Sequence, residues 1–228
     1  FIEAILQSLE DLKGSTLVVG GDGRYGNIEA IEKIVQICIA HKVQKVIVPK
    51  YGLLSTPATS HLIRKENAIG GIILSASHNP GGIDGDFGVK LNISNGGPAP
   101  EIITNKIFKA SQLLTSYKIC KIQLPDFSEY GTYSYGETTL EIIDGLTDYS
   151  NLMEKIFDFD QISDFLKKDF SLIFDAMNAV TGPYAKNIFV EKMGLAPDCV
   201  MNGNPLKDFG GLHPDPNLTY ASHLADLL

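Results

Sequence analysis

Residues 71–98 read GIILSASHNPGGIDGDFGVKLNISNGGP. The apolar run 72–74 is typical of a buried strand, and a hydroxyl side chain, Ser77, follows it closely. A second apolar run, 87–93, comes after a glycine-rich turn and carries Lys90. In α/β folds, reacting groups are found at the carboxyl ends of buried strands. The stretch therefore predicts a strand of a sheet with a nucleophile and a cation at its end.

The sequence before this stretch alternates strand and helix patterns. Short apolar runs are separated by segments with apolar residues at helical spacing. The expected elements are a strand at 17–20, a helix at 28–41, a strand at 46–48, a helix at about 57–66 and the strand at 72–74. Thr56 is the expected N-cap of the second helix. This order implies a mostly parallel, right-handed sheet covered by helices.

The rest of the chain continues the first domain and then starts a second one. We expect a helix at 100–116, an irregular segment at 118–147 with one or two edge strands, and a helix at 148–157 that closes the first unit. A second α/β series then follows, with strands near 172–175 and 198–201 and helices near 182–193 and from 218. The predicted fold class is α/β: a mixed, mostly parallel sheet sandwiched by helices over residues 1–159, followed by a truncated domain of the same type over 160–228.

Composition and charge exclude several classes of protein. Hydrophobic residues are 44% of the 228 residues and charged residues 20%, which is typical of a packed core and not of disorder. The net charge of −8 disfavours nucleic-acid partners, because phosphate backbones select basic surfaces. No apolar run approaches the roughly 18 residues of a membrane span, so integral membrane contact is not expected. Three widely spaced cysteines are typical of reduced thiols, which favours a cytoplasmic location.

The segment 21–26, GDGRYG, matches the dinucleotide-binding pattern G-x-G-x-x-G. That pattern also requires an acidic residue after the second strand, whereas Val48 is followed by Pro49 and Lys50. Asp22 would also lie where a pyrophosphate must approach the backbone. Two other interpretations are favoured: a tight turn whose glycines adopt positive φ, and a position for the Arg24 guanidinium at the edge of the sheet.

Ser77 is the main candidate for the reacting group. A loop serine more often caps a helix or bonds the backbone. Ser77 differs because it follows a buried strand, lies beside His78, and precedes Gly81, Gly82 and Gly85, whose amides are expected to be free to surround an anion. The G-x-S-x-G pattern of serine hydrolases is absent, so phosphoryl transfer is favoured over hydrolysis.

Each neighbouring candidate also has a structural interpretation. His78 alone is more typical of a loop histidine with its bonds satisfied than of a catalyst. Lys90 faces either the same cleft as Ser77 or the solvent at a strand edge. Asp84 and Asp86 are metal-ligand types, but a solvated turn is favoured because no third ligand is near in sequence. Segment 208–217 is dense in turn formers and is interpreted as a rigid connector.

Taken together, these motifs resemble the α-D-phosphohexomutase family, in the phosphoglucomutase branch that includes parafusin. The likeness covers nearly the whole chain and is weakest across 118–140. The motifs that carry it are SASHNPGG at 75–82, GGDGRY at 20–25, LSTPA at 54–58, GDFGVK at 85–90, NGGPAPE at 95–101, DAM at 175–177 and FGGLHPDPNLTY at 209–220. The resemblance implies the first domain and part of the second domain of a four-domain enzyme.

The resemblance also implies a reaction and roles for the site residues. Ser77 would carry a phosphoryl group that interconverts glucose 1-phosphate and glucose 6-phosphate, with glucose 1,6-bisphosphate as intermediate and activator. Mg²⁺ would bind an oxygen of that phosphoryl group. His78 and Lys90 would give acid–base or electrostatic help, while Arg24 and Asn79 would bind substrate or phosphate. The substrate is a phosphorylated hexose and the activity an intramolecular phosphotransferase, an isomerase of carbohydrate metabolism.

Two departures and three rival hypotheses accompany this resemblance. The aspartate-rich metal loop of the family and its third and fourth domains are not in the sequence, so aspartate ligands are expected after Leu228 and these 228 residues alone are expected to be inactive. A sister mutase acting on mannose or glucosamine phosphates is the first rival. A parafusin-like scaffolding phosphoprotein, peripherally associated with secretory vesicles, is the second. A nicotinamide-dependent oxidoreductase using the Gly21 turn is the third.

Overall fold

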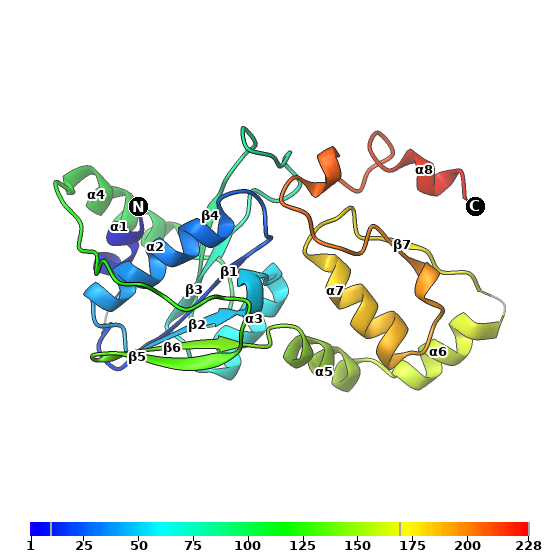
Figure 1. The fold of residues 1–228 in the computed structure, drawn as a ribbon, viewed down its shortest axis with the longest axis horizontal. Helices are drawn as coiled ribbons and strands as arrows, with labels where there is room; N and C mark the ends of the chain where they lie inside the picture. Colours follow the sequence, from blue (N-terminus) through cyan, green and yellow to red (C-terminus); the bar gives the residue numbers. More distant parts are fainter. Residues whose placement is uncertain (10, 169, 228) are drawn as a thin grey trace. The chain divides into compact units, whose positions relative to one another are not determined.

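The chain forms two compact units in a computed structural model that describes residues 1–9, 11–168 and 170–227 (Figure 1). The first unit combines residues 1–21, 27–74 and 89–145. The second unit combines the two short segments 22–26 and 75–88 with the chain from Leu146 onwards. Both of the loops that the sequence singled out, around Arg24 and around Ser77, therefore belong to the second unit.

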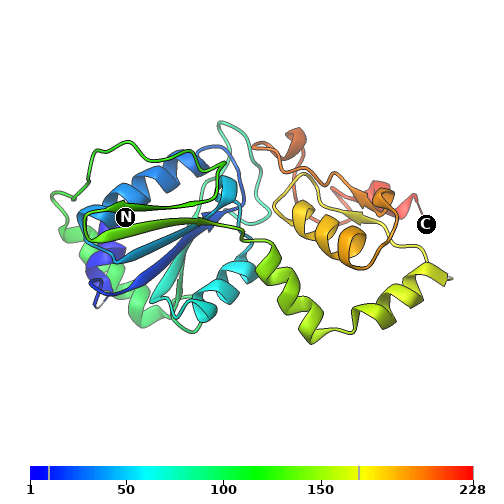
Figure 2. The ribbon, with the colours of Figure 1, turned by 60° about the horizontal axis from the view of Figure 1, so that its bottom comes forward.

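The first unit is built on a mixed sheet (Figure 2). Its described strands are β1 (Thr16–Gly21), β2 (Lys45–Pro49), β3 (Gly70–Leu74), β4 (Val89–Ile93), β5 (Gly131–Tyr135) and β6 (Thr138–Ile143), in the spatial order β4-β3-β1-β2-β6-β5. The four inner strands are parallel, whereas β4 and β5 pair antiparallel at the two edges. The predicted mixed, mostly parallel α/β sheet is confirmed.

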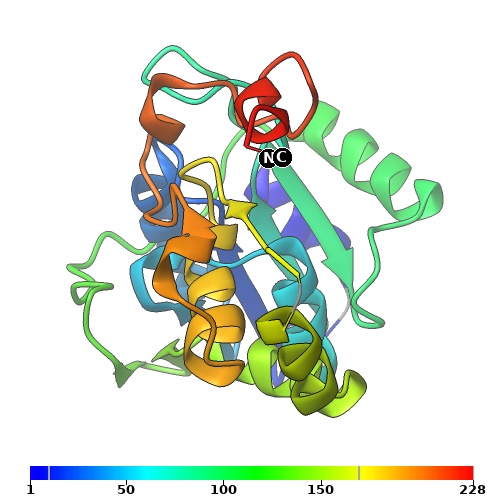
Figure 3. The same ribbon diagram turned by 90° about the vertical axis from the view of Figure 1, so that its right-hand side faces the viewer.

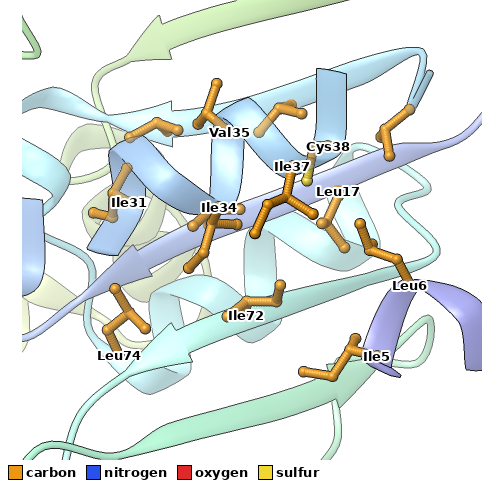
Figure 4. Packing of buried hydrophobic residues seen from close by; sticks show 14 of the residues in the cluster. Ile5, Leu6, Leu17, Ile31, Ile34, Val35, Ile37, Cys38, Ile72 and Leu74 are labelled. Atoms are coloured by element: carbon orange, nitrogen blue, oxygen red, sulfur yellow. The ribbon is translucent and has the colours of Figure 1, made fainter. Parts of the chain in front are cut away.

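Helices cover both faces of this sheet because successive strand residues point to opposite sides. The helices are α1 (Ile2–Ser8), α2 (Asn27–Ala40), α3 (Thr56–Lys65) and α4 (Glu101–Leu113), with a short 3₁₀ turn, η1 (Lys50–Gly52), after β2. Figure 4 shows Leu17, Ile72 and Leu74 packed in one cluster with side chains of α1 and α2. Gly71, one position along β3, lies instead against Ile63 of α3.

Three details of the first unit differ from the sequence expectations. The N-cap of α3 is Ser55, whose hydroxyl accepts a hydrogen bond from the Ala58 amide at 3.3 Å, and Thr56 is the first helical residue. Helix α4 ends at Leu113, before the expected residue 116. Strand β6 is an inner strand, because Leu140 pairs with Val46 of β2 in parallel register while β5 forms the edge.

The second unit has shorter elements. They are α5 (Thr147–Ile156), α6 (Phe159–Lys168), β7 (Phe174–Asp175), α7 (Thr181–Ala185), η2 (Lys186–Lys192), η3 (Pro197–Cys199), β8 (Val200–Met201), η4 (Phe209–Gly211) and α8 (Ser222–Ala225). Strands β7 and β8 pair in parallel, with the continuous helix α7–η2 beside them (Figure 3). The rings of Phe174 and Phe189 lie 5.7 Å apart and join β7 to η2.

Helix α5, which was expected to close the first unit, belongs to the second compact unit and packs against residues of that unit. The Tyr149 ring meets the Tyr184 ring edge-on at 5.5 Å, and Lys192 forms an ion pair with Glu154 at 2.6 Å. The compact second unit therefore takes up the chain at Leu146, ahead of residue 160. Where the domain boundary lies in the full-length protein stays a prediction.

The cysteines and the lengths of the helices bear on two expectations from the sequence. Cys38, Cys120 and Cys199 are free thiols, and burial raises the pKa of Cys38 to about 12. Within residues 1–9, 11–168 and 170–227, we find no helix whose length and apolar character suit a bilayer crossing.

Candidate functional site

The glycines of the 21–26 turn have a backbone explanation. A Cβ on Gly21 would collide with the Leu74 carbonyl and the Asn27 side chain, so only glycine fits where β1 passes β3. Gly23 and Gly26 adopt positive φ of 87° and 81°. Both requirements match the tight-turn interpretation of the pattern. The nicotinamide interpretation has no support in this geometry.

An ion pair fills the interior of this turn. Arg24 is 1% exposed, and its Nε donates to Asp22 Oδ1 at 3.0 Å while its Nη2 donates to Asp22 Oδ2 at 2.9 Å. Asp22 is itself buried. A bidentate arrangement of this kind fixes the plane of the guanidinium and compensates its buried charge. The Asp22 carboxylate is thus engaged with Arg24 inside the turn.

The same guanidinium also bonds the serine loop, residues 75–88. Arg24 Nη2 donates to the carbonyl oxygen of Ser77 at 3.1 Å, and Nη1 donates to the carbonyl oxygen of Asp86 at 2.5 Å. The loop is closed at its base by the Ser75 amide, which donates to the Gly88 carbonyl at 3.0 Å. Arg24 therefore ties together parts of the loop that are far apart in its sequence.

Ser77 is exposed and has the left-handed backbone conformation, with φ at +59°. Serine adopts this conformation rarely, because its Cβ crowds the backbone there. The Ser77 amide donates to Ser75 Oγ at 3.0 Å, which assigns the hydroxyl of Ser75 to holding the turn. Of the two hydroxyls in this segment, that of Ser77 is the candidate for chemistry.

His78 and Asn79 stand beside Ser77 with different surroundings. His78 is exposed, and its Nδ1 lies 3.5 Å from Ser77 Oγ, which is longer than a normal hydrogen bond. Asn79 Nδ2 donates to Asp86 Oδ2 at 3.0 Å, so the amide is engaged within the loop. The roles expected of both residues toward a substrate stay predictions.

The glycines of the loop were expected to offer free amides to an anion, and for Gly85 this is wrong. Its amide donates to the Gly82 carbonyl at 3.1 Å, and the next amide, of Asp86, donates to the Pro80 carbonyl at 3.2 Å. Gly82 has a φ of +110°, and Gly85 lies so close to the backbone of Gly81 that a Cβ would collide with it. These glycines make the loop compact.

Phe209 is a part of this site that sequence reasoning missed. The segment around it was interpreted as a rigid connector, but the Phe209 ring lies 5.2 Å from the Arg24 guanidinium carbon and is 1% exposed. A Cβ on Gly81 would stand 2.6 Å from the ring, so the two are in close contact. The Tyr25 amide also donates to the Lys207 carbonyl at 3.1 Å. A lone aromatic residue among turn formers was the available signal.

Lys90 and the acidic residues of the loop do not complete a site by themselves. Lys90 is exposed on β4 of the first unit, where it pairs with Ile73 of β3, so its relation to Ser77 stays a prediction. Asp84 and Asp86 are exposed. Among the residues that the structure describes, no group of three or more His, Cys, Asp or Glu side chains could hold a metal ion.

Comparison with known proteins gives consistent matches. The family model described as phosphoglucomutase/phosphomannomutase, alpha/beta/alpha domain I, matches residues 1–118. The phosphoglucomutase of Aspergillus fumigatus is 52% identical over 99% of this chain and 41% of its own length. The chloroplastic phosphoglucomutase of Arabidopsis thaliana is 51% identical over 100% of this chain and 37% of its own length.

A solved structure extends this similarity to the fold. It is the open form of the exocytosis-sensitive phosphoprotein parafusin, a phosphoglucomutase from Paramecium. It is 43% identical, with a TM-score of 0.95, and the match covers 99% of this chain and 43% of parafusin. The present chain thus spans about two fifths of the length of such relatives.

Proposed function

Because this chain belongs to the phosphoglucomutase/phosphomannomutase family, we propose that the full-length protein interconverts glucose 1-phosphate and glucose 6-phosphate. The observation that carries the proposal is the exposed Ser77 hydroxyl on a compact loop that directly follows β3. Relatives named phosphoglucomutase, about half identical to this chain, favour glucose over mannose or glucosamine phosphates as the substrate.

The first half of the reaction uses a phosphoryl group carried on Ser77. The C6 hydroxyl oxygen of glucose 1-phosphate attacks the phosphorus of phosphorylated Ser77. A bond forms between that phosphorus and the C6 oxygen, and the bond between the phosphorus and Ser77 Oγ breaks. The hydroxyl proton ends on the serine oxygen, and the product is glucose 1,6-bisphosphate. His78, the nearest titratable side chain in the serine loop, carries that proton.

The second half reverses these roles after the intermediate has turned around. Ser77 Oγ attacks the phosphorus on the C1 oxygen, the bond between that phosphorus and the C1 oxygen breaks, and the serine proton passes to the C1 oxygen. Glucose 6-phosphate leaves and the phosphoserine is restored. In this proposal Lys90 gives electrostatic help to the transfer and Asn79 bonds substrate oxygens.

Mg²⁺ is the metal that family resemblance suggests, but the described residues do not complete a site for it. The described residues contain no group of three His, Cys, Asp or Glu side chains that could bind an ion. The proposal is that a phosphoryl oxygen on Ser77 would bind Mg²⁺, which would neutralise charge on the transferring group.

A cytoplasmic location and peripheral association with secretory vesicles are lesser parts of the proposal. The vesicle association is suggested by the similarity to parafusin, an exocytosis-sensitive phosphoprotein. A purely scaffolding function is less favoured, because Ser77, His78 and Lys90 are all present. Fractionation of cells, with the protein followed in membrane and soluble fractions, tests both points.

The proposed activity is tested on the purified full-length protein with glucose, mannose and glucosamine 1-phosphates as substrates. We expect interconversion of glucose phosphate, and its loss in Ser77→Ala. Ser111→Ala on α4, which also removes a hydroxyl but lies in the first unit, is expected to keep full activity. Equal rates for Ser77→Ala and the unaltered protein would disprove the phosphoserine mechanism. A clear preference for mannose or glucosamine phosphate would show that glucose phosphate is not the main substrate.

A further inference from the structure

We propose that Asp22 and Arg24 are positioning residues that, with Phe209 packed on them, hold Ser77 in its reactive backbone conformation. This inference rests on the proposed function, since it concerns the same serine. It gives Arg24 a different task from the phosphate contact expected from the sequence. It also gives Asp22 and Phe209 a role, which is to hold Arg24 in place.

The first step is that Ser77 needs an external restraint. Its φ of +59° is a conformation that a side-chain-bearing residue leaves unless its surroundings hold it. The loop itself is exposed at Ser77, His78 and Asp86, so burial of these side chains does not provide that restraint. Hydrogen bonds to the backbone of the loop and packing against Gly81 are the restraints that the structure offers.

Arg24 supplies those hydrogen bonds from a buried position. One terminal nitrogen bonds the Ser77 carbonyl at 3.1 Å and the other bonds the Asp86 carbonyl at 2.5 Å. Because the guanidinium is planar and rigid, these two bonds fix the spacing of the two carbonyls. A lysine at this position would retain the charge but lose that fork.

Asp22 keeps the guanidinium in place. Its two oxygens accept from Nε and Nη2 of Arg24 at 2.9–3.0 Å, and Nη2 also donates to the Ser77 carbonyl. Without this carboxylate the buried charge of Arg24 would be uncompensated, and the side chain would be free to turn. Since Arg24 is 1% exposed, little of its surface is open to a dissolved sugar phosphate in this conformation.

Phe209 packs against the guanidinium of the ion pair. Its ring lies 5.2 Å from the guanidinium carbon and touches Gly81 within the serine loop. The neighbouring Lys207 carbonyl accepts from the Tyr25 amide at 3.1 Å, which attaches segment 207–209 to the arginine turn. Three separate pieces of chain, 22–26, 75–88 and 207–209, therefore support one serine.

The test compares variants of the full-length protein: Arg24→Lys, Asp22→Asn, the double variant, and the milder Phe209→Leu. We expect kcat to fall by about 10- to 100-fold in Arg24→Lys and Asp22→Asn, because a displacement on the order of 1 Å has that effect, while KM for glucose 1-phosphate changes little. The double variant should lose no more than the worse single variant, because the pair acts as one unit. Phe209→Leu should give a smaller loss of the same kind.

Hydrogen exchange provides a readout that does not depend on activity. The amides of Gly85 and Asp86, both bonded within the loop, should exchange faster in Arg24→Lys and Asp22→Asn. Lys45→Met serves as the control. It removes two partly buried ion pairs of the first unit, with Glu66 and with Glu141. It should change neither the loop exchange nor kcat.

The outcomes separate this inference from the proposed function. A rise in KM with kcat retained would show that Arg24 binds the substrate phosphate, and the inference would be wrong. Unchanged exchange of the loop amides in both single variants would also overturn it. If the unaltered protein has no mutase activity, the proposed function fails, and faster exchange in the variants would still support the positioning of Ser77. Should Asp22→Asn not fold, Phe209→Leu and Arg24→Lys give the same decisions.

Discussion

Strand β3 (Gly70–Leu74) and the loop 75–88 are consecutive in sequence, yet their conformations have different origins. Every residue of β3 is buried, and its shape follows from pairing with β1 and β4. The loop is largely exposed and contains Ser77 in the left-handed conformation. Its shape depends on the buried Arg24, from another part of the chain. Burial determines the strand, whereas specific polar contacts determine the loop.

The largest effect on stability is expected from the strand. Ile72→Ala truncates a side chain that is fully buried between β3 and the helices of the first unit (Figure 4). We expect the free energy of unfolding to fall by about 2–5 kcal/mol, because the change removes apolar contacts and leaves a cavity. Urea unfolding followed by circular dichroism measures it. At a temperature where the variant is folded, kcat should be unchanged. A lower kcat with the same urea midpoint would contradict the view that burial determines the strand and polar contacts determine the loop.

The opposite pattern is expected at the base of the loop. A Cβ on Gly88 would collide with the Ser75 carbonyl oxygen and stand 3.3 Å from the Ala76 Cα. Gly88→Ala should therefore move Ser77 and lower kcat by roughly 10-fold, with a smaller change in the urea midpoint than Ile72→Ala. Gly97→Ala, where a Cβ would meet only the side chain of Asn95, is the control. Equal kcat for the two alanine variants would count against a precisely held loop.

A smaller effect is expected at the start of α3. Ser55→Ala removes the hydroxyl that accepts from the Ala58 amide at 3.3 Å, and should lower the free energy of unfolding by about 1 kcal/mol. Thr56→Ala, at the first helical position, should cost less. Comparing the urea midpoints of Ser55→Ala and Thr56→Ala shows which residue is the N-cap. A greater loss for Thr56→Ala would restore the capping assignment made from the sequence.

A pH-dependent effect is expected from the buried carboxylate of Glu3. Burial alone would raise the pKa of Glu3, but hydrogen bonds from His41, the Lys118 amide and Gln7 outweigh it and lower the pKa. A lowered folded-state pKa means that stabilisation is present above the unfolded value, about 4.3, and is lost as the pH falls through the folded value. Thermal midpoints of Glu3→Gln measured between about pH 7 and pH 3 should fall less steeply than those of the unaltered protein. If the thermal midpoints of both proteins fell equally with pH, Glu3 would not contribute to the pH dependence of stability.

The same division explains what the sequence could and could not predict. The series from β1 to β3 was predictable because apolar residues repeat at strand and helix spacing over short stretches. The inner place of β6 was not, because its partner β2 is far away in sequence and local patterns do not specify distant pairing. The helical pattern of α6 was overlooked beside the two lysines at its end.

The candidate site divides in the same way. Ser77 and the glycine turn were predictable from residue types next to a buried strand. The carbonyl partners of Arg24 were not, because Ser77 and Asp86 are far from it in sequence and only the folded chain brings them to the guanidinium. Phe209 was missed for the same reason, since its contact with Gly81 joins segments far apart in sequence.

One measurement tests the central claim most directly: mass spectrometric location of the phosphoryl group on the full-length protein after incubation with glucose 1,6-bisphosphate. A single phosphate should be found on the peptide that contains Ser77, and added glucose 1-phosphate should remove it as hexose bisphosphate forms. A phosphate on any other side chain, or one that stays on Ser77 while sugar phosphates interconvert, would contradict the account.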